Sequence, residues 1–207
     1  EILFIYDNYV SFVKRDYEIL TETGHNVNKK KFVASKKIVT ILTSFLTQFF
    51  TLLFTGYKYD IVYIWFADYH SFLPILFSNI WPYKTILNIA GFDASKVPSI
   101  KYGLFESKAE RIFCGEYAIK HANLIIGVDN SMISGENTFT ETLPTGVKYF
   151  VPNLKGETSV IPFGFDPTIW KRNESIKTEK NTVLSIGKAS DIMTVKRKGF
   201  DFLHEVA

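Results

Sequence analysis

The chain has 207 residues and a mass of 23.8 kDa, enough for one full domain and the beginning of another. Hydrophobic residues make up 46% of it and the net charge is only +3, which argues against disorder and against a nucleic-acid-binding protein. The single cysteine, Cys114, excludes an internal disulfide framework and favours a reducing, cytoplasmic setting. Because the sequence begins directly with an apolar, strand-like run, we expect no signal peptide.

Strands and helices are predicted to alternate along most of the chain. Residues 3–6 predict a buried strand, residues 11–22 a helix and residues near 27 a second strand, which together make a right-handed βαβ unit. Further strands are predicted at 61–65, 83–89, 124–128 and 158–161, with helices over 71–79 and 105–121 between them. Because nearly every strand is apolar throughout, the fold class is α/β, a Rossmann-like doubly wound parallel sheet.

Residues 36–55 form an unusually apolar segment that has no charged residue after Lys37, and in it threonine, serine and glutamine recur every three or four residues on one helical face. Its length allows a transmembrane span, but the hydroxyl-bearing face and the strand that follows favour a helix packed on the sheet. An interfacial membrane helix is the other alternative, because the apolar stretch Ile38–Phe54 is preceded by residues that attract anionic lipid, namely Lys29, Lys30, Lys31, Lys36 and Lys37.

The alternation of apolar strands and helices is interrupted after residue 165. We predict a first domain over 1–165, a charged linker over 166–181 and the first βα unit of a second domain over 182–207, with a strand at 183–187 and a helix from about 199. Since one strand and one helix cannot bury a core, we expect the chain to be part of a longer protein.

Ligands of open parallel sheets bind at the carboxyl ends of the strands. The loop after the first strand lacks a Gly-x-Gly-x-x-Gly pattern and no Walker loop is present, which lowers the expectation of an NAD- or FAD-dependent oxidoreductase. The four histidines and one cysteine are scattered, so no metal site and no cofactor are predicted.

Several segments, in order, resemble retaining GT-B glycosyltransferases of family 4, the "group 1" family. Ile161-Pro162-Phe163-Gly164-Phe165-Asp166, then Val183-Leu184-Ser185-Ile186-Gly187-Lys188, then Lys198-Gly199-Phe200-Asp201-Phe202-Leu203 resembles that family's crossing between domains. Upstream, 16–27, 59–63 and 118–128 resemble its first helix and turn and two of its strands. The resemblance spans nearly the whole chain and implies transfer of a sugar from a nucleotide-sugar to a glycan or lipid-linked acceptor, with this part supplying the acceptor side.

The resemblance also implies donor-binding residues. Gly187 ends the predicted strand and allows a close approach of the backbone to a ligand, while Lys188 and Lys198 would place cations near the diphosphate as it leaves. The family usually has arginine at Lys188, and the spacing to Lys198 is longer here. Residues 196–198 can also be read as a solvated basic loop.

On the acceptor side, Asn88-Ile89-Ala90-Gly91-Phe92-Asp93 takes the place of the family's His-Gly-x-Asp loop, with Ala90 where that family has histidine. Gly91 and Asp93 match, and Asp93 is the candidate catalytic or sugar-binding residue, although a turn aspartate is an equal interpretation. The remaining candidates follow the first and third strands, where an aromatic ring or a polar side chain could hold a sugar: Asn8, Tyr9, Trp65, Asp68 and His70. Trp65 is equally well explained as a core residue.

Glu106, Glu110 and Glu116 share one predicted helix with basic residues, including Arg111, and the spacing predicts a solvated charged face.

Two alternatives to the transferase remain. One is a non-catalytic module that binds an anionic membrane surface through residues 29–54, and the other is a nucleotide-sugar epimerase of the same fold. The membrane alternative is compatible with a transferase, which would then be cytoplasmic and peripheral on the inner face of the membrane.

Overall fold

The computed structural model describes residues 1–35, 37–135, 144–177, 182–187 and 189–206. Contacts divide the chain into two units, Glu1–Phe163 and Gly164–Ala207, so the division falls close to the predicted boundary at 165.

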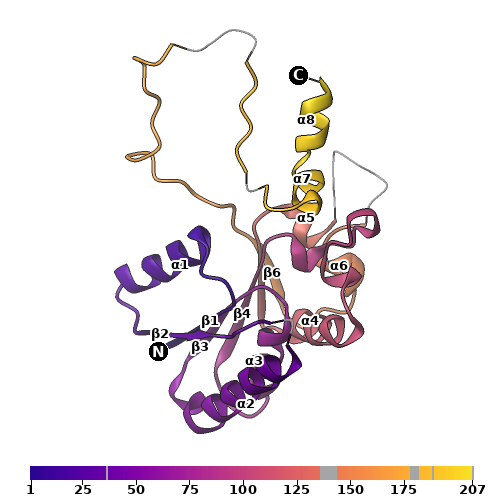
Figure 1. The fold of residues 1–207 in the computed structure, drawn as a ribbon. Helices are drawn as coiled ribbons and strands as arrows, with labels where there is room; N and C mark the ends of the chain where they lie inside the picture. The colour runs from indigo at the N-terminus through magenta and orange to yellow at the C-terminus, as the bar shows by residue number, and fades with distance from the viewer. Residues whose placement is uncertain (36, 136–143, 178–181, 188, 207) are drawn as a thin grey trace. The chain divides into compact units, whose positions relative to one another are not determined.

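The first unit is built on a sheet whose described strands number six and lie in the order β2-β1-β3-β4-β5-β6 (Figure 1). Every neighbouring pair is parallel, which confirms the predicted α/β class with a parallel, Rossmann-like sheet. The strands are β1 (Ile2–Tyr6), β2 (Val27–Lys31), β3 (Ile61–Trp65), β4 (Lys84–Ile89), β5 (Leu124–Gly127) and β6 (Glu157–Val160).

Helices cover both faces of this sheet. One face packs against α2 (Ile38–Thr55), α3 (Tyr69–Phe77) and α4 (Ala109–His121), and the core there includes Ile5, Ile64 and Leu87. The other face packs against α1 (Ser11–Glu22) through Phe4, Val13 and Trp65. Two single-turn helices, α5 (Asn130–Ile133) and α6 (Val147–Phe150), follow β5.

Strand β2 is the exception to the apolar strands. It lies at the edge of the sheet and carries three consecutive lysines, of which Lys29 and Lys31 are exposed. Charged residues on an edge strand discourage pairing with another chain.

The segment between β4 and α4 is irregular, as predicted, and contains 3₁₀ turns at Phe92–Ala94, Pro98–Ile100 and Leu104–Glu106. The helix predicted from residue 105 therefore begins only at Ala109. The delay arises because Ser107 and Lys108 have extended backbones, with ψ of −175° and 150°, which separate the 3₁₀ turn from the helix.

In the second unit the predicted strand at 183–187 does not form. Residues 182–187 have no regular structure, and Val183, Leu184 and Ile186 are all exposed. A strand needs a hydrogen-bonded neighbour, and the described residues of this unit offer none. Instead the unit contains two short helices, α7 (Ile192–Lys198) and α8 (Phe200–Val206), separated by Gly199 in the left-handed conformation.

Candidate functional site

The chain reverses its direction of travel along the sheet between β1 and β3. From β1 it continues to β2 on one side, and it then returns to place β3 on the other side of β1. This arrangement makes a topological switch point, where the loops after neighbouring strands diverge and leave room for a ligand at their carboxyl ends. The loops that meet this position are 7–10 after β1 and 66–68 after β3.

Arg111 and Asp68 form a two-pronged ion pair at this edge. Arg111 Nε donates to Asp68 Oδ1 at 2.8 Å, and Arg111 Nη2 donates to Asp68 Oδ2. The Asp68 side chain is 7% exposed and that of Arg111 33% exposed. Burial lowers the pKa of Arg111, but hydrogen bonds and charge from Asp68, with help from Tyr69 and Asp7, raise it above its ordinary value overall.

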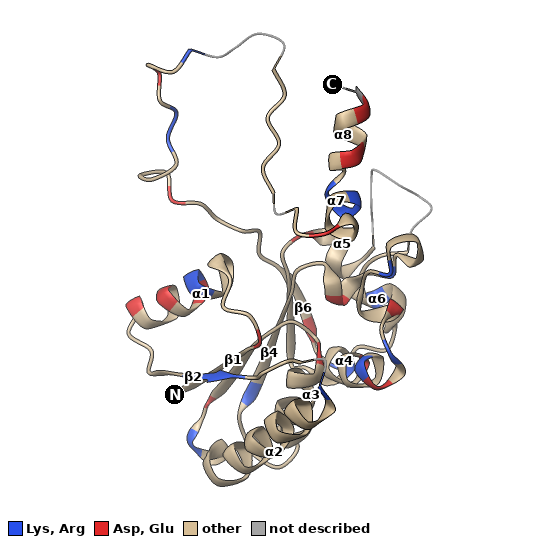
Figure 2. Cartoon of the chain, viewed as in Figure 1, with Lys and Arg blue, Asp and Glu red and all other residues tan. Residues whose placement is uncertain are grey.

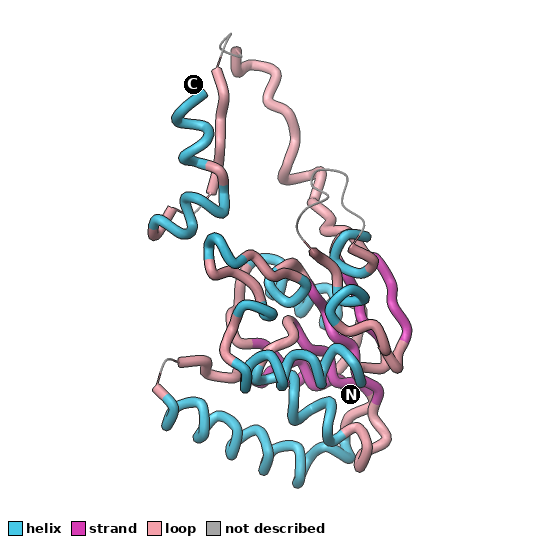
Figure 3. Tube along the Cα trace, turned by 90° about the vertical axis from the view of Figure 1, so that its right-hand side faces the viewer, coloured by secondary structure: helices cyan, strands magenta, loops and turns pink. Residues whose placement is uncertain are grey.

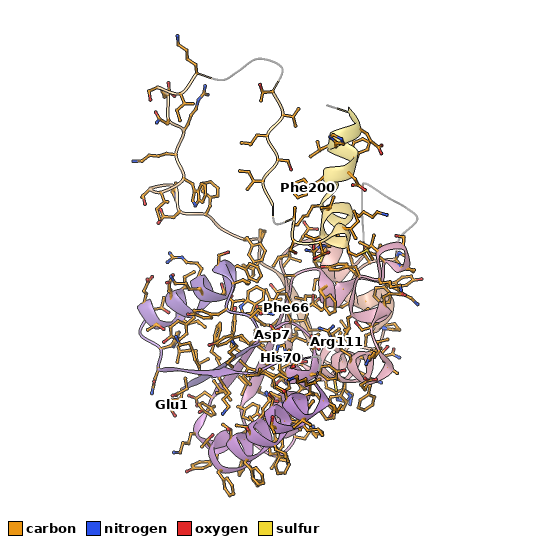
Figure 4. The ribbon with its side chains drawn as sticks, viewed as in Figure 1. Glu1, Asp7, Phe66, His70, Arg111 and Phe200 are labelled. Carbon is orange, nitrogen blue, oxygen red and sulfur yellow. The ribbon has the colours of Figure 1, made fainter. Side chains whose placement is uncertain are left out.

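The pair positions a permanent cation beside the loop after β1. The guanidinium carbon of Arg111 also lies 4.6 Å from the centroid of the Phe92 ring, in the loop after β4. Figure 4 labels Asp7, Phe66, His70 and Arg111, which come from the loops and helices at this edge. Our sequence interpretation of Arg111 as a solvated surface charge was therefore wrong, because a helical spacing cannot reveal a partner 43 residues away in the chain.

Phe66 has the left-handed backbone that non-glycine residues rarely adopt, with a φ of 72°. Its N–H donates to Asn88 O at 2.9 Å, and its ring lies 6.0 Å from that of Phe12. Strained residues of this kind cluster at binding sites, where surrounding contacts hold them in place. Phe66 therefore marks the loop after β3 as part of the candidate site.

Asp93 is fully buried and binds backbone groups. Its Oδ2 accepts from Ala67 N at 3.2 Å, and its Oδ1 accepts from Ala90 N and Gly91 N at 3.1 and 3.2 Å. Burial raises the pKa of this carboxyl to about 6, although the backbone donors act to lower it. The side chain thus joins the loops after β3 and β4, which matches the turn interpretation that we set beside the catalytic one.

Two other acceptor-side candidates lie in the interior. Trp65 is 2% exposed and donates from Nε1 to Asp16 Oδ2 at 3.1 Å. His70 is 1% exposed, and its Nε2 lies 2.6 Å from Trp65 O. Asp68 begins α3, where its carboxylate accepts from Tyr69 N at 2.7 Å. These three side chains shape the edge from within, whereas Asn8 and Tyr9 are exposed and accessible to a ligand.

A polar network on the α1 face was not foreseen from the sequence. Tyr63 Oη donates to Asp16 Oδ2 at 2.6 Å and lies 3.1 Å from Asn88 Oδ1. Burial raises the pKa of Asp16, against the hydrogen bonds from Tyr63 and Trp65, and burial likewise raises the pKa of Tyr63. Only the odd polar residues inside apolar strands, Tyr63 and Asn88, could have signalled it.

The donor-side candidates belong to the second unit. Gly187 is exposed, and a Cβ added there would lie 2.8 Å from Phe200 Cζ, so the glycine lets the backbone approach that ring. Lys198 is the last residue of α7 rather than a loop residue. Lys188 lies outside the described residues.

A second candidate surface is the outward side of α2, which we call the apolar face. Figure 2 shows α2 without a charged residue along its length, and the helix runs along the outside of the first unit (Figures 1 and 3). Of the described part of the chain, only Ile38–Lys58 is long and apolar enough to cross a membrane, and 11% of it is buried. The face consists of eight exposed side chains: Ile38, Val39, Leu42, Leu46, Phe49, Phe50, Leu53 and Phe54.

The other side of α2 is fixed to the domain. Gln48 Nε2 donates to His70 O at 2.9 Å, and Trp81 Nε1 donates to Leu52 O at 2.9 Å. Leu52 is fully buried, and Phe49, which the apolar face includes at 38% exposed, also contacts Phe77 of α3 with one side of its ring. The predicted packed helix is therefore present, but only one side of it packs.

Two hollows accompany these features. One of about 510 Å³ lies at the amino end of β6, lined by residues that include Lys148 and Glu157, on the edge opposite to the switch point. The other, of about 330 Å³, lies between the end of β2 and α2. Because helix N-termini and switch-point loops gather at the carboxyl edge, the first hollow plays no part in the candidate site.

No protein-family model, no curated protein and no solved structure gives a significant match to this chain.

Proposed function

We propose that this chain is the acceptor-side half of a retaining glycosyltransferase of the GT-B, family 4 type. It would help to transfer a sugar from a nucleotide-sugar to a glycan or lipid-linked acceptor. One observation carries the proposal: three of the segments that resemble this family in sequence belong to the neighbouring strands β4, β5 and β6 or directly follow them. Residues 88–93 end β4 and form the loop after it, 118–128 contain β5, and 161–163 directly follow β6.

The chemistry of the edge supports a saccharide ligand. Asn8 offers an amide and Tyr9 an aromatic ring, and both are exposed. Sugars present hydroxyl groups and apolar C–H faces, so an amide beside an aromatic ring suits them. Arg111 and Asp68 hold the neighbouring loop in place, and Asp93 joins it to the loop after β4. These buried groups act as positioning residues.

Saturation-transfer NMR with a panel of mono- and oligosaccharides tests the proposal. We expect binding that weakens about tenfold in Tyr9→Ala, the equivalent of losing roughly 1.4 kcal/mol of binding free energy. Tyr149→Ala is the matched control, since Tyr149 is exposed but follows β5 in α6, away from the loop after β1. Failure of every saccharide to bind would overturn the proposal, and saturable binding of NAD⁺ would favour the epimerase instead.

We further propose that the domain binds the surface of an anionic membrane through α2. The apolar face exposes eight large side chains, and burying a Leu or Phe side chain fully contributes about 1.5–3 kcal/mol, so partial burial of eight contributes several kcal/mol. The segment from Thr23 to Tyr59 contains six lysines and no acidic residue. Lysines beside an apolar helix attract anionic lipid.

The hydroxyl groups of α2 are compatible with this location. Thr47, Thr51 and Thr55 each donate to the carbonyl four residues earlier, at 2.8, 2.7 and 2.6 Å. Their donors are therefore satisfied within the helix. Since the opposite side of α2 is bound to α3, the helix would lie in the plane of the interface and would not span the bilayer.

Co-sedimentation with phosphatidylcholine vesicles, with and without anionic lipid, tests the membrane proposal. We expect binding to the anionic vesicles that weakens with salt and falls at least about tenfold in a Leu46→Gln, Phe50→Gln variant. Phe113→Gln is the control, because Phe113 on α4 is equally exposed, at 60%, but lies outside the apolar face. Equal loss in the control, or no binding by the unaltered chain, would refute the proposal.

A further inference from the structure

A hollow lies between β2 and α2, beside the apolar face, and several of the side chains that line it are polar. Its volume is about 330 Å³, room for roughly ten water molecules at about 30 Å³ each. Its lining combines the last two residues of β2, Lys30 and Lys31, and the two residues after them with the hydroxyl-bearing side of α2, which contributes Thr43, Thr47 and Gln48.

Lys30 supplies a cation on the α2 side of the sheet. Side chains alternate along a strand, and Lys30 is in register with Ile5, which belongs to the core beneath α2. Lys29 points the other way, with its Nζ 4.1 Å from the centroid of the Tyr17 ring on α1. Lys30 is half-buried and forms no ion pair with any residue that the structure describes. A half-buried ammonium without a carboxylate partner favours an anionic ligand.

The α2 wall supplies hydrogen-bond acceptors. Thr43 and Thr47 donate to helix carbonyls at 2.9 and 2.8 Å, which leaves the lone pairs of both hydroxyls available. Gln48 is 3% exposed, and its Oε1 has no hydrogen-bond partner within the described structure. A buried acceptor without a donor is costly, and a hydroxyl group that enters the hollow can supply one. A ligand that satisfies both walls therefore carries an anionic group and free hydroxyls.

We propose that this hollow binds the headgroup of a membrane lipid, a phosphodiester that bears free hydroxyl groups, with its phosphate at Lys30 and its hydroxyls at Thr43, Thr47 and Gln48. The inference rests on the proposed membrane binding, because the apolar face of α2 brings the hollow to the level of the headgroups. The hollow then selects among anionic lipids that the lysines alone would not distinguish.

Two lipids of equal charge distinguish recognition of the headgroup from simple electrostatic attraction to an anionic surface. Phosphatidylglycerol and phosphatidylmethanol both carry one negative charge, but only the first has glycerol hydroxyls. We expect the 207-residue chain to bind vesicles of phosphatidylcholine with phosphatidylglycerol at least about fivefold more tightly than matched vesicles with phosphatidylmethanol, a difference of roughly 1 kcal/mol. Soluble glycerol 3-phosphate should compete only weakly, because it lacks the acyl chains, and full competition would show that a free phosphate is the ligand and overturn the proposal.

Lys30→Gln and Lys29→Gln give a matched pair, since they remove the same charge from adjacent residues on opposite faces. We expect Lys30→Gln and Thr47→Val to abolish the preference for phosphatidylglycerol, and Lys29→Gln to retain it. Equal effects of the two lysine variants, or equal binding of the unaltered chain to both lipids, would overturn the headgroup site while leaving membrane binding intact. If the chain bound no vesicles at all, both proposals would fail together.

Discussion

Arg111 at the start of α4 and Asp68 at the start of α3 hold two helices together by a two-pronged ion pair at the carboxyl edge of the sheet. Asp68 also accepts from the first N–H of α3, so one buried carboxylate both caps a helix and binds a cation. The pair fixes the loop after β3 to the first turn of α4.

Removing the Arg111 cation alone should lower the free energy of unfolding at least as much as removing both charges of the Arg111–Asp68 pair. Arg111→Met leaves the Asp68 carboxylate, whose side chain is 7% exposed, without its partner. We expect this variant to lower the free energy of unfolding by about 2–3 kcal/mol. That is less than the roughly 3–5 kcal/mol typical of fully buried pairs, because the Arg111 side chain is one-third exposed. The double variant with Asp68→Asn should be no less stable than Arg111→Met alone, since asparagine still caps the helix. Urea unfolding of the four proteins in a double-mutant cycle measures this, and additive effects would contradict it.

Adjacent leucines in α2 should respond very differently to truncation. Leu52 is fully buried, so Leu52→Ala should cost about 2–5 kcal/mol of unfolding free energy through lost burial and a cavity. Leu53 belongs to the apolar face, and Leu53→Ala should cost less than about 1 kcal/mol in water. Thermal or urea unfolding without lipid compares them. A large loss in Leu53→Ala would mean that the apolar face is packed in the free protein.

The stability of the domain should depend on the ionisation of Asp93. The folded-state pKa of about 6 lies above the ordinary aspartate value of 3.8, so the folded chain retains a proton between pH 4 and 6 that the unfolded chain has released. The contribution of this group is therefore fully present below about pH 4 and is lost as the pH rises through 6, by up to about 3 kcal/mol.

Unfolding of the unaltered chain and of Asp93→Asn at several pH values isolates this effect. The unfolding free energy of the unaltered chain minus that of Asp93→Asn should decrease from pH 4 to pH 6 and be constant above pH 7. If the difference instead increased with pH, the three backbone donors would outweigh burial and the pKa would be depressed.

Two glycines with positive φ should differ in their tolerance of alanine. A Cβ at Gly103 would lie 2.0 Å from Ser95 O, whereas nothing lies within 4 Å of a Cβ at Gly24. We expect Gly24→Ala to cost about 1–2 kcal/mol, the strain of the left-handed conformation alone. Gly103→Ala should cost clearly more, because the backbone of the loop must move. Comparable losses in unfolding free energy for both would show that the loop adapts easily.

The sequence was sufficient for the sheet and most of its helices. Apolar runs bounded by polar turns located β1, β3, β4 and β5, and the first helix spans Ser11–Glu22 as predicted. The edge of the sheet that carries the candidate site also follows from the parallel connections alone. Local patterns succeed here because the central strands lie between helices on both faces of the sheet and are therefore apolar along most of their length.

Side-chain partners and the orientation of α2 could not be predicted in the same way. Asp68 and Arg111 are 43 residues apart, and nothing in either local pattern indicates the other. In α2 apolar residues occupy both the packed and the open side, so periodicity identifies a helix but not which side faces the core. The apolar run at 183–187 has the composition of a strand, but composition does not supply a neighbouring strand.

The apolar face of α2 also bears on how the protein behaves at high concentration. The apolar face contains no charged residue that would keep two copies apart, so in water it can be covered either by a bilayer or by the same face of another molecule. The same side chains cannot do both at once. Self-association and membrane partition must therefore compete, and the apparent affinity for lipid should decline as the total protein concentration rises.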